Sequence, residues 1–147
     1  MRRDLETIIS DFDYFRESFN DYRKKKEINK DTLIEFEARL VDLRADLRPF
    51  RKEIAAEWQK RDDKAATGIK FRIAIAINNG TFVDEEGRQI FDCNSINQAE
   101  KFASGSDKYK EFLDQRSFFK ESLVNITDLR NDIDGYINLI KDILKTI

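Results

Sequence analysis

The chain has 147 residues, of which 40% are hydrophobic and 38% are charged. A sequence of this size with both classes in quantity predicts one folded domain over residues 1–147 and excludes disorder along the whole chain. The 27 basic and 29 acidic residues give a formal net charge of −2. No overall positive field therefore attracts nucleic acid or a membrane, and such binding would need a local basic patch.

The residue types that are missing exclude several kinds of site. The sequence has no histidine and one cysteine, Cys93. This excludes Ser-His-Asp and Cys-His catalysis, histidine-bearing zinc sites and thiolate clusters, and the sequence contains no GxxxxGK[ST] phosphate loop. We therefore predict no enzymatic activity, no catalytic residues, no metal and no cofactor. With no signal peptide or membrane-spanning apolar run expected, the predicted location is cytoplasmic.

The first predicted helix covers residues 4–25. Its apolar side chains recur every three or four residues, which is a heptad pattern. They are Leu5, Ile8, Phe12, Phe15, Phe19 and Tyr22. The basic residues at positions 23–26 suit the C-terminus of a helix, where cations meet the negative end of the helix dipole.

The second predicted helix starts at Thr32, which forms a capping box with Glu35. The same three-four spacing then runs along the segment. It comprises Leu33, Phe36, Leu40, Leu43, Leu47, Phe50 and Ile54, followed by Trp58. Pro49 removes one helical hydrogen bond, but the apolar spacing continues through it, so we expect a kink and not an end.

Residues 65–93 allow two interpretations. Phe71, Ile73, Ile75 and Ile77 alternate with Arg and Ala, which is strand periodicity, whereas Ile69, Ile73 and Ala76 also share one helical face. We favour a helix to about Ile77 and a small β-hairpin at 81–92, because Asp84–Gly87 is a typical turn sequence.

The end of the chain is predicted to be helical. Ser95 and Gln98 form a second capping box, which opens a short helix that the Ser104–Ser106 segment either ends or bridges. Six residues then recur every seven positions over about 40 residues. They are Phe112, Phe119, Ile126, Ile133, Ile140 and Ile147. The predicted fold is mainly α, with long antiparallel helices in a coiled-coil-like hairpin or bundle, and we expect homo-oligomerisation.

A basic stripe is the candidate binding surface. Arg44, Arg48, Arg51 and Lys52 share one side of the second predicted helix, a pattern that suits phosphate contact. The alternative is a solvated face whose cations pair with Asp42, Asp46, Glu53 and Glu57. A second basic group, Lys24, Lys25 and Lys26, lies at the first connection between helices.

The remaining chemical groups favour structural roles. We expect Asp62 and Asp63 on a solvated helix surface, Asp84–Glu86 at a turn, and Cys93 as a half-buried small residue. Most of the phenylalanines are predicted core residues. Four aromatic residues fit the heptad stripes less well and are candidates for a partner patch or a base-stacking platform. They are Tyr14, Trp58, Phe71 and Phe118.

Part of the sequence resembles a known family. The Lys70–Ala76 segment resembles an alanine-interleaved helix of small phage-encoded helical proteins, and the segments at 97–101, 106–110 and 128–130 resemble the rest of that pattern. Some of these proteins are similar to phage recombination mediators. That resemblance, over roughly residues 40–145, implies binding to single-stranded DNA and to a recombinase, with assembly into a helical oligomer. The slight acidity and the predicted hairpin depart from the family.

Two functions compete at this point. The first is a non-enzymatic module, a phage-type accessory, inhibitor or scaffold protein, whose helical face docks a protein partner. The second is a mediator-like accessory protein that binds single-stranded DNA through the basic stripe. The mixed surface charge and the many aromatic residues favour the first, and neither involves a membrane.

Overall fold

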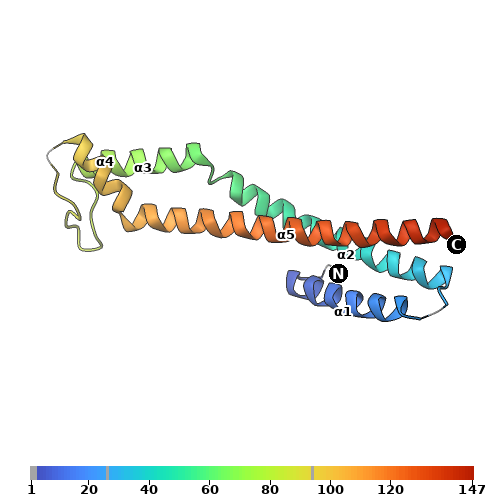
Figure 1. The fold of residues 1–147 in the computed structure, drawn as a ribbon. Helices are drawn as coiled ribbons and strands as arrows, with labels where there is room; N and C mark the ends of the chain where they lie inside the picture. Colours follow the sequence, from blue (N-terminus) through green and yellow to red (C-terminus); the bar gives the residue numbers. More distant parts are fainter. Residues whose placement is uncertain (1–2, 26, 94) are drawn as a thin grey trace. The chain divides into compact units, whose positions relative to one another are not determined.

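The computed structural model describes residues 3–25, 27–93 and 95–147, which form five helices and no regular strand (Figure 1). The helices are α1 (Leu5–Arg23), α2 (Lys30–Gln59), α3 (Asp63–Asn78), α4 (Ile96–Gly105) and α5 (Asp107–Thr146). The mainly helical fold class is confirmed. Among the described residues, no helix has the length and apolar character needed to cross a membrane.

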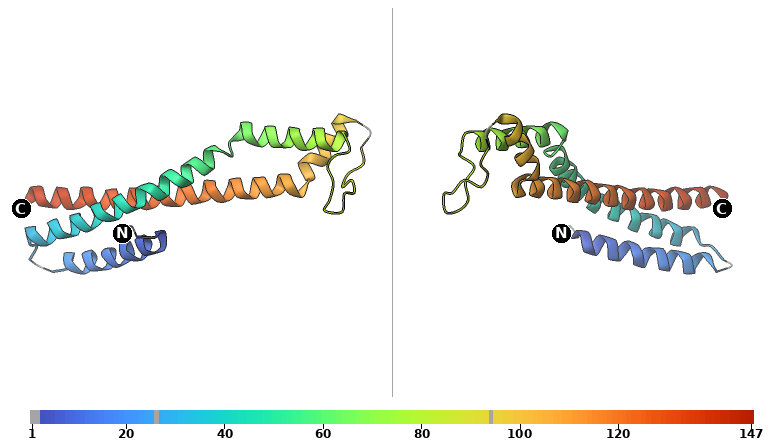
Figure 2. Two further views of the ribbon diagram at one scale, coloured as in Figure 1. Left: turned by 180° about the vertical axis from the view of Figure 1, so that it is seen from behind. Right: turned by 60° about the vertical axis from the view of Figure 1, so that its left-hand side comes forward.

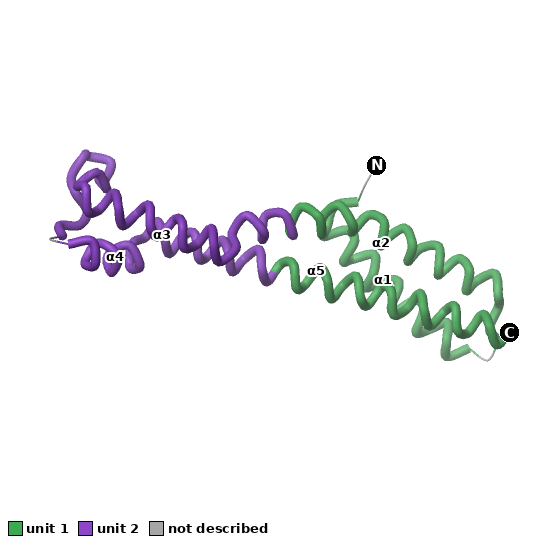
Figure 3. Tube along the Cα trace, turned by 90° about the horizontal axis from the view of Figure 1, so that it is seen from above, with its two compact units in different colours: residues 1–54, 122–147 green, residues 55–121 purple. Residues whose placement is uncertain are grey.

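The contacts divide the chain into two compact units (Figure 3). Unit 1 comprises Met1–Ile54 and Ser122–Ile147, and unit 2 comprises Ala55–Glu121. The single domain over residues 1–147 stays a prediction, and we treat each unit as a separate body.

Unit 1 has a core of large apolar side chains. Helix α1, the first part of α2 and the last part of α5 lie side by side in every view (Figures 1 and 2). Except for Ile137, the buried residues belong to the predicted stripes: Ile8, Phe12, Phe15, Phe19, Leu33, Phe36, Leu40, Leu43, Leu47, Ile126, Ile133, Ile137 and Ile140. Phe15 meets the rings of Phe36 and Tyr136 edge to face, with centroid separations of 5.6 and 5.5 Å. The apolar spacing thus predicted most of this core, but Ile147 of the last predicted stripe is 63% exposed and follows the end of α5.

The start of α2 differs from the prediction. The helix begins at Lys30, so Thr32 lies inside its first turn. Asn29 caps it: its backbone oxygen accepts from Leu33 N at 3.1 Å, and its side-chain oxygen accepts from Asp31 N at 2.8 Å. Asparagine caps helices at least as well as threonine, and its earlier position allows three more residues to join the helix. Helix α2 then runs through Pro49 without a break.

Unit 2 contains α3, α4 and a smaller core. Residues 63–78 are helical, so the helical interpretation is confirmed and the strand alternative is wrong. Helices α3 and α4 bury Ile73, Ala74 and Ile77 against Ala99 and Ala103. Small side chains on both helices allow this close packing.

Residues 81–92 do not form the predicted pair of strands. They contain one isolated antiparallel bridge, between Val83 and Gln89. The turn is held by the Asp84 carboxylate, which accepts from the backbone N–H groups of Glu86 and Arg88 at 2.9 and 3.0 Å. Phe82 and Phe91 pack against the α3–α4 core, which competes with regular cross-strand pairing.

Two serines define the ends of α4. Ser95 caps its start by accepting from Gln98 N at 3.3 Å, as predicted. The helix ends at Gly105, and Ser106 is extended and buried. The Ser106 hydroxyl donates to the Ala103 carbonyl at 2.8 Å and accepts from Tyr109 N at 3.3 Å, so it joins the end of α4 to the start of α5.

Candidate functional site

A groove in unit 1 brings the predicted basic stripe together with a second helix. It has a volume of about 470 Å³ and lies between the middle of α2 and the part of α5 near residue 130. We call it the basic groove. Its lining residues are Arg44, Leu47, Arg48, Arg51 and Lys52 of α2, with Arg130 and Asp134 of α5.

Packing of the core sets the position of the stripe. Leu43 and Leu47 of α2 are 2% and 1% exposed, which fixes the rotation of the helix. Arg44, Arg48 and Arg51 are then neighbours along one edge of α2, because residues three and four apart lie on the same side of a helix. From Arg44 to Lys52 the stripe extends about 12 Å at ~1.5 Å per residue.

Two of the arginines are held in place by α5. Arg44 Nη1 donates to Asp134 Oδ1 at 3.1 Å. Arg51 Nε donates to Thr127 Oγ1 at 3.3 Å. These contacts limit the side-chain freedom that a ligand would otherwise have to remove on binding.

The other three cations have no such partner. Arg48 and Lys52 are exposed, and neither forms a hydrogen bond or an ion pair with any residue that the structure describes. Arg130 is half-buried, and its Nε is covered without an acceptor. Five cationic side chains therefore line the groove beside one carboxylate, Asp134, which leaves four positive charges uncompensated within the lining.

The acids expected to neutralise the stripe are partly engaged elsewhere. Asp46 accepts from Arg3 Nη1 at 2.7 Å, a hydrogen bond that raises the pKa of Arg3. Glu57 pairs with Arg61 at 2.8 Å and with Lys60 at 3.2 Å. Its hydrogen bonds to Arg61 and then Lys60 lower the pKa of Glu57. Asp46 and Glu57 therefore pair with cations outside the stripe.

The second predicted basic group does not line the groove. The side chain of Lys24 is 80% exposed and approaches Asp21 at 3.9 Å. Lys25 is exposed beyond the end of α1, and Lys26 lies outside the described residues. Arg23 lies in the last turn of α1 and Lys24 is its C-cap, as the helix-dipole argument predicted.

The acidic candidates have structural roles. Asp62 caps α3 by accepting from Ala65 N at 2.8 Å. Asp63 pairs with Arg116, and Asp84 holds the turn in residues 81–92. The Cys93 thiol is half-buried and lies 3.7 Å from the Ile77 carbonyl, as expected for a small core residue.

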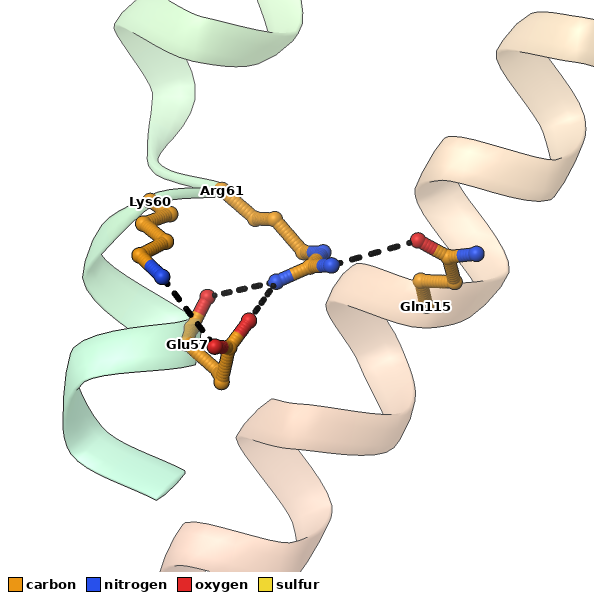
Figure 4. Close-up of polar contacts among 4 residues, drawn as sticks. All are labelled: Glu57, Lys60, Arg61 and Gln115. Atoms are coloured by element: carbon orange, nitrogen blue, oxygen red, sulfur yellow. Dashed lines mark hydrogen bonds and ion pairs between the residues drawn. The ribbon is translucent and has the colours of Figure 1, made fainter. Parts of the chain in front are cut away.

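A polar network in unit 2 involves the other basic residues near the end of α2. Figure 4 shows Arg61 donating to the carboxylate and the backbone carbonyl of Glu57, and also to Gln115 Oε1 at 3.3 Å. The Arg61 guanidinium also lies 4.6 Å from the ring centroid of Phe119. This network ties residue 61, just after α2, to α5 within unit 2, and its cations already have partners.

The four unassigned aromatic residues do not line the basic groove. Tyr14, Phe71 and Phe118 are 68%, 56% and 64% exposed. Trp58 is half-buried, with Arg116 and Lys120 at 5.3 and 5.8 Å from its ring. These side chains therefore add no stacking surface to the lining of the groove.

Arg130 and Asp134 are the α5 residues of the groove, and the sequence analysis selected neither. A signal for Arg130 was present, since it stands seven residues before Ile137, a buried residue of the α5 stripe. An arginine in a heptad position that is otherwise apolar is costly unless its charge has a use or a partner. Comparison with known proteins gives no family model, no curated protein and no solved structure that matches the chain.

Proposed function

We propose that the chain is a non-enzymatic binding protein that docks a protein partner through the basic groove. The observation that carries the proposal is the uncompensated charge of the groove, where Arg48, Lys52 and Arg130 have no partner among the described residues. Charged patches of this kind select a partner of opposite charge and speed its association. An acidic segment of a protein is the partner that the proposal names.

The dimensions of the groove favour a protein segment over a nucleic acid strand. The stripe extends only about 12 Å along α2. None of the seven lining residues is aromatic, whereas single-strand binding usually combines basic grooves with stacked aromatic side chains.

The proposal includes coiled-coil-like packing of the unit 1 helices and self-association. Burial of Ile126, Ile133 and Ile140 at intervals of seven residues supports the packing. Exposed apolar residues on the outer faces of α1 and α2 support self-association, since such residues gather at contacts between copies. They are Ile9, Ile34 and Val41. A role as an accessory or inhibitor protein, of the phage type that the sequence resembles, is consistent with a docking groove and self-association.

A mediator-like protein that binds single-stranded DNA is the second proposal. The predominance of arginine in the groove favours it, because guanidinium groups bind phosphate oxygens in pairs. It predicts affinity for oligo-dT that falls steeply as salt rises.

Fluorescence anisotropy with two labelled probes, poly-L-glutamate and oligo-dT, tests the proposals at about 50 mM salt, where charge contacts are strong. The test variant is Arg48→Glu/Lys52→Glu. The matched control is Lys110→Glu/Lys141→Glu, which makes the same charge change at exposed α5 residues outside the groove. Poly-L-glutamate should bind the wild type and the control, and the groove variant should bind at least roughly tenfold more weakly.

Each outcome assigns a function. Equal losses in the two variants would indicate a net-charge effect and remove the groove from the proposal. Tighter binding of oligo-dT than of poly-L-glutamate would favour the second proposal. No binding of either probe would contradict both.

A further inference from the structure

Two arginines of α5 occupy the same heptad position. Arg116, Leu123, Arg130, Ile137 and Leu144 follow one another at intervals of seven. Both arginines have an Nε atom that is covered and has no acceptor. Burial of guanidinium groups in a stripe of apolar residues is unfavourable unless another interaction compensates it.

The two positions differ in what surrounds the arginine. Arg116, in unit 2, pairs with Asp63 and lies 5.3 Å from the Trp58 ring. Arg130, in unit 1, forms no hydrogen bond, ion pair or ring contact with any described residue. Arg116 therefore has a partner within the chain, whereas Arg130 has none among the described residues and is available to a ligand.

The side chains around Arg130 suit a compact anion with several oxygens. Arg44 and Arg51 are fixed by Asp134 and Thr127. Arg48 and Lys52 are exposed and unpaired among the described residues. Fixed guanidinium groups beside exposed, unpaired cations form a site that can surround one charged group on several sides.

We propose that the basic groove binds a phosphoryl group carried by a serine, threonine or tyrosine of the protein partner. This inference rests on the proposed function and names the chemistry of the docked segment. A phosphoryl group carries about −1.5 to −2 charges at pH 7 and three strong acceptor oxygens. A carboxylate supplies two oxygens and one charge, and so compensates the groove less completely.

The short extent of the groove favours one phosphoryl group over a phosphodiester strand. A strand continuing along α2 would run past the cations, because the stripe extends only about 12 Å along the helix. A single phosphorylated side chain can contact the cations without extending beyond the stripe. Clusters of arginine are a recurrent means of recognising phosphorylated motifs.

The test uses one short peptide in three forms, with phosphoserine, serine or glutamate at the central position between glutamates. Binding to the full chain is measured by titration calorimetry. The phosphorylated form should bind at least roughly tenfold more tightly than either other form, as expected for added charge-assisted hydrogen bonds. Inorganic phosphate should compete with it.

Variants of Arg130 locate the effect. Arg130→Gln should remove most of the phosphoserine preference, and Arg130→Lys should keep part of it, because the charge remains but the planar fork is lost. Lys141→Gln, on the same helix outside the groove, should keep it fully. Thermal melting checks that each variant folds. If Arg130→Gln does not fold, Lys52→Gln, at an exposed position of the same groove, replaces it as the test variant.

The outcomes separate this inference from the proposed function. Equal affinities for the three peptides, with poly-L-glutamate still bound, would overturn the phosphoryl inference and leave acidic docking intact. Loss of the phosphoserine preference together with loss of poly-L-glutamate binding would overturn the phosphoryl inference and the proposed function together. Displacement of the phosphopeptide by a much lower concentration of oligo-dT would replace the inference with strand binding.

Discussion

The two units of this protein are stabilised by cores of different kinds. The buried core of unit 1 consists entirely of phenylalanine, leucine and isoleucine, whereas three of the five buried core residues of unit 2 are alanines. Large side chains at heptad spacing fix how three helical segments pack, and small ones allow α3 and α4 to approach closely. The first kind of core should be sensitive to loss of volume and the second to added volume.

The largest expected effect is removal of an aromatic ring from unit 1. Phe19 is fully buried and contacts the rings of Phe15, Phe36 and Tyr136. Phe19→Ala should lower the free energy of unfolding by about 3–5 kcal/mol, through lost transfer energy and a residual cavity. Urea denaturation measures it, with Tyr14→Ala at an exposed position of the same helix as control. A loss equal to that of the control would contradict the core assignment.

A smaller loss of stability is expected when a larger side chain is placed in the core of unit 2. Ala99 is fully buried between α3 and α4. Ala99→Leu should destabilise this packing by about 1–3 kcal/mol, seen as faster hydrogen exchange in residues 63–105. The exposed Ala56→Leu is the matched control in the same unit. Unchanged exchange in Ala99→Leu would show that the core of unit 2 has spare room.

A smaller loss of stability is expected from a substitution at the junction of α4 and α5. Ser106→Ala removes the buried hydroxyl that contacts Ala103 and Tyr109, and should cost about 0.5–2 kcal/mol, as for other helix caps. Ser104→Ala serves as the control, since Ser104 is exposed and its hydroxyl bonds within α4. Equal melting temperatures of the two variants would contradict the capping role.

The smallest expected effect is on how the stability of the fold depends on pH. Hydrogen bonds to Arg61 and then Lys60 lower the pKa of Glu57 in the folded state. A lowered folded pKa stabilises the fold above the unfolded pKa, and this contribution is lost as pH falls below about 5. Glu57→Gln should therefore melt below the wild type at pH 7 and approach it in acid. A difference that is constant with pH would remove Glu57 from the acid response.

The contrast between the units also explains what the sequence could predict. In unit 1 the three-four spacing of large residues identified every helix and most of the core. In unit 2 the alternation of alanine with isoleucine at residues 73–77 fits both strand and helix periodicity, so the structure was needed to decide. The turn at Asp84 was recognisable, but the packing of Phe82 and Phe91 against other helices was not, because it depends on distant contacts.

Only the α2 side of the basic groove could be predicted from the sequence. The α2 stripe followed from helical spacing, whereas the contribution of Arg130 depends on which part of α5 packs beside α2. The heptad relation of Arg130 to Ile137 was a local signal, but only the structure shows that the arginine lacks a partner among the described residues.

The most direct test of the central claim is to map binding on the full chain by amide NMR during titration with the phosphoserine peptide. We predict shift changes concentrated at residues 44–52 of α2 and 127–134 of α5, which vanish in Arg48→Glu/Lys52→Glu. Shifts confined to unit 2, or shifts that persist in that variant, would contradict the assignment of the basic groove as the binding site.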